Sequence, residues 1–160
     1  MSYLEDIKVG VNRELGSFTF TAQAIKDFAR QFDPQPFHLD EEAGRASLFG
    51  GLAASGWHLT AVFMKLLIAN AQREQAAAKA RGEDIAPGGP SPGFKNMRWL
   101  KPVLAGDTLT YFTEVKATRL SASRPQWGIM EGEITAYNQR GELVFSFENA
   151  AFMPRRNSAA

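Results

Sequence analysis

Residues 52–67 read LAASGWHLTAVFMKLL, and they form the most apolar stretch of the 160-residue chain. Within it the larger apolar residues recur at helical spacing, at Leu59, Val62, Phe63, Leu66 and Leu67. Alanine, glycine and other apolar residues fill most of the remaining positions, so the pattern predicts a long helix that is buried on most sides. From Asn70 onwards the residues are still helix-prone but polar. We therefore expect the same helix to continue outwards into water.

The segment before this helix predicts a short strand followed by an amphipathic helix. Phe18 and Phe20 alternate with threonines, as in a half-buried strand. Thr21 is a candidate N-cap for a helix over residues 22–32, whose apolar face would carry Ile25, Phe28, Ala29 and Phe32. The helix should end at Asp33, because a residue that precedes proline is disfavoured in α geometry.

After residue 93 the hydrophobic period changes from helical spacing to two. Strand patterns cover residues 94–100, 108–117, 127–137 and 143–148. Residues 138–141 predict a hairpin turn in which Gly141 can take positive φ. Helices followed by antiparallel strands indicate an α+β domain. We predict one buried helix wrapped by a curved antiparallel β-sheet, in a single domain over residues 1–154 with a frayed polar tail at 155–160.

The stretch between helix and strands, residues 85–93, is rich in proline and glycine. Two interpretations remain open for it. It is either a flap near a ligand or a plain connector, and short loops are more often connectors.

Composition excludes several classes of function. Eighteen Lys and Arg against 17 Asp and Glu give a net charge of +1, without the basic excess of a nucleic-acid-binding protein. The chain has no cysteine and two histidines, which excludes disulfides and a cysteine nucleophile and argues against a multi-histidine metal site. The first residues lack the pattern of a signal peptide, and no stretch is apolar enough to span a membrane, so we expect a soluble, cytoplasmic protein that binds neither nucleic acid nor membrane.

Residues 33–38, Asp-Pro-Gln-Pro-Phe-His, are the strongest candidate for chemistry. Two prolines restrict the segment, so Asp33 and His38 can be held at one water molecule with little ordering cost. A carboxylate beside an imidazole is a typical acid–base pair. The alternative is structural: Asp33 ends a helix and His38 packs against Phe37.

A second candidate site lies at the predicted start of the buried helix. Ser55 is a plausible N-cap, which makes Gly56 an early helical residue with a free N–H. Without a Cβ, Gly56 would allow a carbonyl oxygen to approach that N–H and be stabilised there as an oxyanion. The alternative is that the small residues only permit tight helix packing. We expect His58, two residues further on, to be a packed residue and not a catalyst.

Five residues are candidates for substrate binding: Gln35, Ser55, Trp57, Arg98 and Lys101. Arg98 and Lys101 flank an apolar pair and could contact the phosphates of a nucleotide-like handle. A solvated strand end is the alternative for both.

These residues resemble the MaoC-like dehydratase family, which includes the (R)-specific enoyl-CoA hydratases and has the hot-dog fold. The family motif is Asp-x-Asn-Pro-x-His, which Asp33, Pro36 and His38 match, while Gln35 stands where asparagine is usual. Gly56 follows the histidine by eighteen positions, and residues 98–109 resemble a family segment that ends in Pro-Val-x-x-Gly-Asp. The resemblance covers about residues 18–153.

The resemblance implies a hydro-lyase. Asp33 and His38 would activate one water, and the Gly56 N–H would bind the thioester oxygen. The reaction would be reversible hydration of a trans-2-enoyl thioester to a 3-hydroxyacyl thioester, in the (R) series. The substrate would be a coenzyme A or acyl carrier protein thioester, and no metal or redox cofactor is implied.

The family usually forms dimers, so the resemblance also implies a homodimer or a higher homo-oligomer. Met64 falls where some hydratases carry a serine near the acyl tunnel, which leaves the acyl chain undetermined. Two alternatives stay open: an acyl-CoA thioesterase on the same fold, and a non-catalytic acyl-thioester-binding protein.

Overall fold

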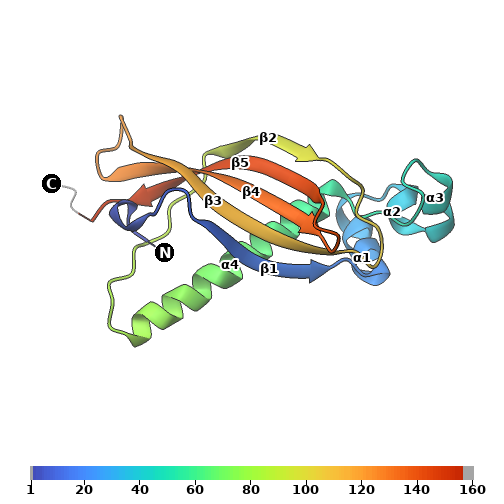
Figure 1. Ribbon diagram of the computed structural model, residues 1–160, viewed down its shortest axis with the longest axis horizontal. Coiled ribbons are helices and arrows are strands. Elements are labelled where there is room, and N and C mark those ends of the chain that lie inside the picture. The colour runs from blue at the N-terminus through green and yellow to red at the C-terminus, as the bar shows by residue number, and fades with distance from the viewer. Residues whose placement is uncertain (1, 157–160) are drawn as a thin grey trace.

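A computed structural model describes residues 2–156 and places one long helix against a curved antiparallel sheet (Figure 1). The sheet has five strands in the order β1-β3-β4-β5-β2, and every neighbouring pair is antiparallel. The strands are β1 (Asn12–Thr19), β2 (Gly93–Trp99), β3 (Thr108–Leu120), β4 (Trp127–Asn138) and β5 (Leu143–Pro154). The predicted α+β class is confirmed.

The long helix, α4 (Gly56–Ala80), lies along the inner side of the sheet. Three shorter helices gather near its N-terminal end: α1 (Ala22–Phe32), α2 (Pro36–Leu39) and α3 (Glu41–Ala46). A 3-10 turn, η1 (Leu4–Asp6), lies at the opposite end of the sheet.

The core is the seam between α4 and the sheet. Leu59, Val62 and Phe63 of α4 pack against buried sheet residues that include Leu15, Leu109, Tyr111, Ile134 and Phe145. The Tyr111 hydroxyl is buried there and donates a hydrogen bond to the Leu59 carbonyl at 3.1 Å, so its polar atom is satisfied. Each large apolar side chain buried in this seam contributes about 1.5–3 kcal/mol. The seam therefore holds the first turns of α4, which carry the candidate site, in a fixed place.

The predicted capping and turn residues are confirmed. The Thr21 side chain accepts a hydrogen bond from the Ala24 N–H at 3.1 Å and caps α1, which ends before Asp33 as expected. Gly141 has φ +74 in the turn between β4 and β5. Phe32 was predicted on the buried face of α1 and that prediction is wrong: it is 68% exposed and is the last residue of the helix.

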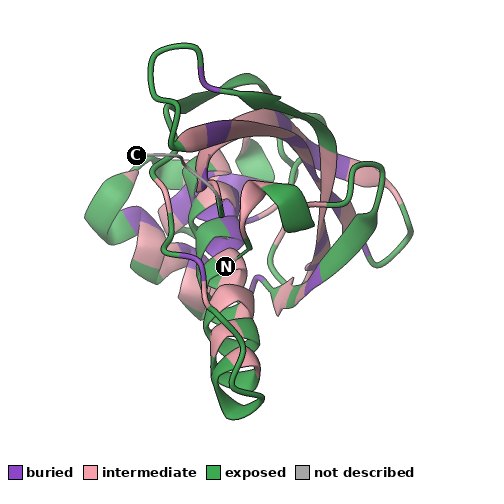
Figure 2. Cartoon of the chain, turned by 90° about the vertical axis from the view of Figure 1, so that its left-hand side faces the viewer, coloured by how far each residue is buried: buried purple, intermediate pink, exposed green. Residues whose placement is uncertain are grey.

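The helix α4 is less buried than its composition predicts. Residues 52–55 are extended, and α4 begins at Gly56, directly after the predicted N-cap Ser55. One side of its first half is buried, whereas Trp57, Met64 and Ile68 face solvent. The polar second half projects away from the sheet, as expected (Figure 2). A single copy of the sheet covers only one side of an apolar helix.

The loop at residues 85–93 is a connector between α4 and β2, at the end of the sheet away from α2 and α3 (Figure 1). It is fixed to β5, because the Phe152 N–H donates to the Pro90 carbonyl at 3.0 Å and the Ser91 hydroxyl donates to the Ala150 carbonyl at 2.7 Å. The flap interpretation is therefore not supported by its position.

The polar tail begins in an ordered way. The Arg155 N–H donates to the Gln126 carbonyl at 3.1 Å, and the Arg156 N–H donates to the Glu5 carboxylate at 3.1 Å. The prediction of fraying is thus wrong for these two residues, which pair with groups distant in the sequence; residues 157–160 lie outside the described part of the chain. Within residues 2–156, no helix combines the length and the apolar character needed to cross a membrane.

His58 is a packed residue, as the sequence indicated. Its ring stacks on Phe28 with centroids 4.5 Å apart and meets the edge of Phe20 at 5.0 Å. Burial in this aromatic cluster disfavours the imidazolium and lowers the pKa of His58 to about 4. The folded protein therefore resists protonation of His58, whereas the unfolded chain does not.

This difference predicts a pH-dependent stability. As pH falls from 6.5 towards about 4, His58 becomes protonated in the unfolded state but stays neutral in the folded state. The free energy of unfolding should therefore decrease over this range. His58→Gln should lose less stability over the same range, as measured by urea denaturation. His38 is the only other histidine and stays intact in the variant. Equal pH dependence of the two proteins would contradict the assignment.

Candidate active site

The segment between α1 and α3 brings Asp33 and His38 together. The Asp33 N–H closes α1 by donating to the Ala29 carbonyl at 2.9 Å, and Pro34 prevents the helix from continuing. Pro36 then opens α2, where proline costs no hydrogen bond. The predicted loop thus contains one short helix, and this turn of helix directs His38 back towards Asp33.

His38 is held in one tautomer and faces the carboxylate. Its side chain is buried, and its Nδ1 lies 2.7 Å from the Ala53 carbonyl oxygen. A carbonyl oxygen only accepts, so Nδ1 carries the hydrogen and Nε2 presents a lone pair. Nε2 lies 3.4 Å from Asp33 Oδ2. When the ring is neutral, His38 Nε2 and Asp33 Oδ2 are therefore two hydrogen-bond acceptors that face each other.

Asp33 is kept ionised by its neighbours. Burial alone would raise the pKa of the Asp33 carboxyl, but hydrogen bonding from Ser55 and Gln35 and the proximity of His38 together lower that pKa below its ordinary value. The Gln35 amide donates to Asp33 Oδ1 at 2.8 Å. Gln35, which departs from the family motif, thus supports the carboxylate directly.

Ser55 links this carboxylate to the start of α4. Its side chain is fully buried, and its Oγ accepts from the Trp57 N–H at 3.2 Å, which confirms it as the N-cap. The same hydroxyl lowers the pKa of Asp33, so one side chain acts on both the acid and the first turn of the helix.

The extended residues 52–55 place the helix start beside the acid–base pair. The Ala53 N–H donates to the Phe37 carbonyl at 3.2 Å on one side. On the other side, the Ala54 N–H donates to the Val103 carbonyl at 2.8 Å. The Ala105 N–H donates to the Leu52 carbonyl at 2.9 Å. This segment is therefore clamped between α2 and the loop before β3. The sequence could not predict the role of the Ala53 carbonyl, because every residue has a backbone carbonyl.

Gly56 follows directly after Ser55, and the absence of a side chain at this position has a packing consequence. A Cβ on Gly56 would lie 2.5–2.8 Å from atoms of the Trp99 indole. The missing side chain thus makes room for Trp99, so the packing alternative accounts for the glycine. Its N–H forms no hydrogen bond with any residue in the described range 2–156, and it remains available at the positive end of α4.

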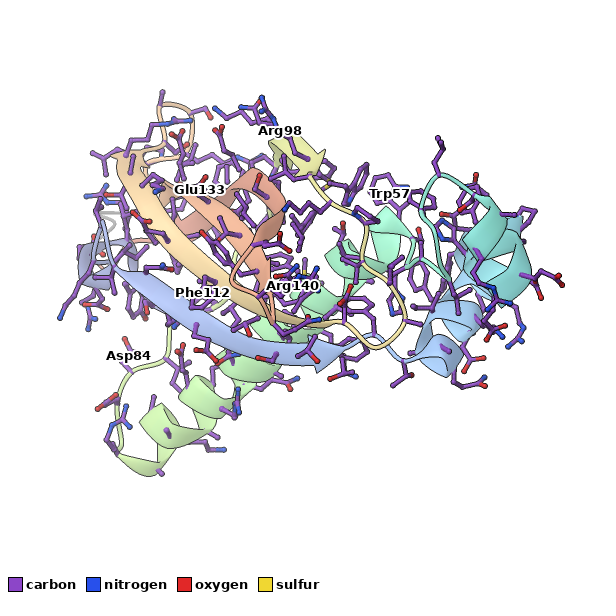
Figure 3. All side chains as sticks on the ribbon, turned by 45° about the vertical axis from the view of Figure 1, so that its right-hand side comes forward. Trp57, Asp84, Arg98, Phe112, Glu133 and Arg140 are labelled. Atoms are coloured by element: carbon purple, nitrogen blue, oxygen red, sulfur yellow. The ribbon has the colours of Figure 1, made fainter. Side chains whose placement is uncertain are left out.

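Three predicted substrate-binding residues remain, Trp57, Arg98 and Lys101, and Figure 3 labels the first two. Trp57 is exposed at the start of α4, with its ring edge-on to Trp99 at 5.6 Å. Arg98 is exposed on the edge strand β2. Lys101 pairs with Glu142 at 2.6 Å, and Asn138, Lys101 and Arg140 hold the pKa of Glu142 at about 2. Contact of Arg98 or Lys101 with a substrate phosphate stays a prediction.

No metal centre accompanies the pair in the part of the chain that the structure describes: no three His, Asp or Glu side chains are grouped so that they could hold an ion.

Comparison with known proteins assigns the family. Residues 8–133 match the MaoC like domain. A MaoC-like dehydratase of known structure from Rhodospirillum rubrum is 40% identical, with a TM-score of 0.82 over 99% of this chain and 100% of that chain. The uncharacterised protein YdeM of Bacillus subtilis (strain 168) is 30% identical over 152 residues, which are 95% of this chain and 99% of that protein.

A third relative is a mesaconyl-CoA hydratase of Haloarcula marismortui, 35% identical over 80 residues, which are 49% of this chain and 22% of that protein. The (R)-hydratase of A. caviae shares the fold at 24% identity, with a TM-score of 0.68 over 94% of this chain and 99% of that chain. The chain belongs to the MaoC-like dehydratase domain family, and its hot-dog fold is confirmed.

The double role of Ser55 leads to a prediction. Ser55→Ala should lower the free energy of unfolding by about 0.5–2 kcal/mol, because α4 loses its cap. It should also raise the pKa of Asp33, because a group that lowers it is removed. Denaturant titration and carboxyl NMR titration measure the two effects. Thr21→Ala, which removes the cap of α1, is the matched control: it should cost similar stability and leave the Asp33 pKa unchanged. An unchanged Asp33 pKa in Ser55→Ala would refute the link.

Proposed function

We propose that this protein is a hydro-lyase that adds water reversibly to a trans-2-enoyl-CoA thioester and forms the (R)-3-hydroxyacyl-CoA. The observation that carries this proposal is the convergence of His38 Nε2 and Asp33 Oδ2, 3.4 Å apart, at the start of a helix. Two acceptors at this separation suit a water molecule that donates hydrogen bonds to both.

Proton transfer follows from the different basicity of the two groups. Imidazole is in general a stronger base than a carboxylate, and the neighbours of Asp33 lower its pKa further. His38 Nε2 therefore takes a proton as the water oxygen bonds to C3 of the enoyl group. Asp33 stays ionised and stabilises the resulting imidazolium. His38 then returns the proton to C2, so that one water has been added across the double bond.

Charge on the thioester must be stabilised during this addition. As the C3–O bond forms, the π electrons move through C2 onto the thioester oxygen, which becomes an enolate oxygen. The free Gly56 N–H, at the positive end of the 25-residue helix α4, is the donor we assign to that oxygen. When C2 accepts the proton, the electrons return and the thioester is restored.

Coenzyme A is the carrier that we propose. Support comes from the mesaconyl-CoA hydratase, which is 35% identical over 49% of this chain, and from the exposed aromatic Trp57 beside the helix start. Arg98 remains a candidate contact for the cofactor's phosphates because it is exposed on the edge strand. No further cofactor takes part in the proposed chemistry.

We propose that the active form is a homodimer. Trp57, Ala61, Met64 and Ile68 line one face of α4 at helical spacing, and all four are exposed. An apolar helical stripe of this kind normally faces a protein partner. The neighbouring strand β2 lies at an edge of the sheet and has a free side. A second copy offers both a matching stripe and a matching edge.

The catalytic assignment is tested by two substitutions. Asp33→Asn and His38→Ala should each lower kcat for crotonyl-CoA hydration by about 10²–10⁴-fold, because each removes a group of the acid–base pair. Loss of enoyl-thioester absorbance measures the rate, and thermal unfolding checks the fold. Asp27→Asn, on the exposed face of α1, is the matched control and should keep wild-type activity. Wild-type rates in either site variant would refute the assignment.

The dimer is tested by charge insertion. Ile68→Glu should convert the dimer into monomer in size-exclusion chromatography with light scattering, because it would bury an unpaired carboxylate. Leu120→Glu is the control, since Leu120 is exposed at the end of β3 and lies outside the stripe. A monomeric wild-type protein, or an Ile68→Glu dimer of unchanged stability, would contradict the proposed interface.

A further inference from the structure

Trp99 makes two specific contacts with a single residue, Gly56. Its indole Nε1–H donates a hydrogen bond to the Gly56 carbonyl oxygen at 3.0 Å. Its ring also occupies the place of the missing Gly56 side chain. Thr60 donates a second hydrogen bond to the same carbonyl at 3.2 Å. Two side chains therefore hold the Gly56 carbonyl in place.

Burial does not explain why Trp99 lies there. The side chain is 46% exposed and lies on the edge strand β2, most of whose residues face solvent. A tryptophan whose role was only to fill the core would bury its ring, and its indole N–H would need no particular partner. Here the N–H is directed at the first residue of α4, and the ring at that residue's Cα.

The peptide groups on both sides of the Gly56 Cα are held. In the preceding peptide, the Ser55 carbonyl accepts from the His58 N–H at 2.9 Å. In the following peptide, the Trp57 N–H donates to Ser55 Oγ at 3.2 Å. The carbonyl of that peptide accepts from Trp99. Between them, the Gly56 N–H forms no hydrogen bond within the described residues. A donor with both neighbours fixed and no partner of its own is preorganised for an external acceptor.

We propose that Trp99 is a positioning residue for the Gly56 N–H, acting through the Gly56 backbone and not on the substrate. This inference rests on the proposed function, in which that N–H stabilises the thioester oxygen. Trp99 lies 43 positions from Gly56 in the sequence, so β2 carries a part of the active site that the motif at residues 33–38 does not reveal.

The test uses Trp99→Phe, which keeps an aromatic ring and removes the N–H donor. The Gly56 amide can be observed alone, because Ser55-Gly56 is the only Ser-Gly pair in the chain. Carbonyl labelling of serine together with nitrogen labelling of glycine therefore selects this amide in an NMR spectrum. Trp127→Phe, the same substitution at the far end of the sheet, is the matched control.

We expect the Gly56 amide resonance to shift in Trp99→Phe and to stay in place in Trp127→Phe. We also expect kcat for crotonyl-CoA to fall about tenfold or more in Trp99→Phe, with KM changed far less, because a misplaced oxyanion donor affects the transition state most. Trp99→Leu, which also removes the ring, should lose at least as much.

Three results would be decisive against the inference. An unmoved Gly56 resonance would show that Trp99 does not position this amide. A moved resonance with wild-type kcat would show that the position is irrelevant to catalysis. A loss of thermal stability with no change in kcat would make Trp99 purely structural. If the wild-type protein hydrates no enoyl-CoA, the proposed function fails, and the amide resonance alone decides the positioning by Trp99.

Discussion

The hydrogen bond from His38 Nδ1 to the Ala53 carbonyl oxygen joins the two halves of the site. One half is the segment between α1 and α3, with its acid and its imidazole. The other is the extended segment that leads into α4, with its cap and its free N–H. The bond sets the tautomer of His38, because a carbonyl can only accept, and so directs the free lone pair at Asp33. Without it, neither the distance within the pair nor its position relative to Gly56 would be defined.

The sheet makes this arrangement rigid. Packing of Leu59, Val62 and Phe63 against the inner side of the sheet fixes the first turns of α4. The loop before β3 fixes the segment that precedes the helix, and β2 fixes Gly56 through Trp99. The groups proposed to react are therefore held by three separate parts of the chain. Preorganisation of this kind lets the donor and the base meet a transition state without further ordering.

Local rules of the sequence predicted the two longer helices, their caps and the proximity of Asp33 and His38. Thr21, Ser55 and Gly141 have the conformations that their chemistry favours, and the two prolines restrict residues 33–38 as expected. The errors arise where tertiary contacts decide. The exposure of Phe32 depends on what packs against the last turn of α1, which the sequence of the helix does not show. The reason for glycine at position 56 lies in Trp99, on another strand, so no local pattern could have shown it.

The central claim is that Asp33 and His38 add one water to an enoyl thioester whose oxygen is bound at the start of α4. The most direct test is to incubate the wild-type protein with crotonyl-CoA in water labelled with heavy oxygen and to analyse the products by mass spectrometry. The account predicts an intact CoA thioester that has gained one labelled water, with the heavy oxygen on C3. Free coenzyme A together with a labelled carboxylic acid would show thioester hydrolysis and contradict it. A panel of enoyl-CoA esters that includes crotonyl-CoA and stays entirely unchanged would contradict it too.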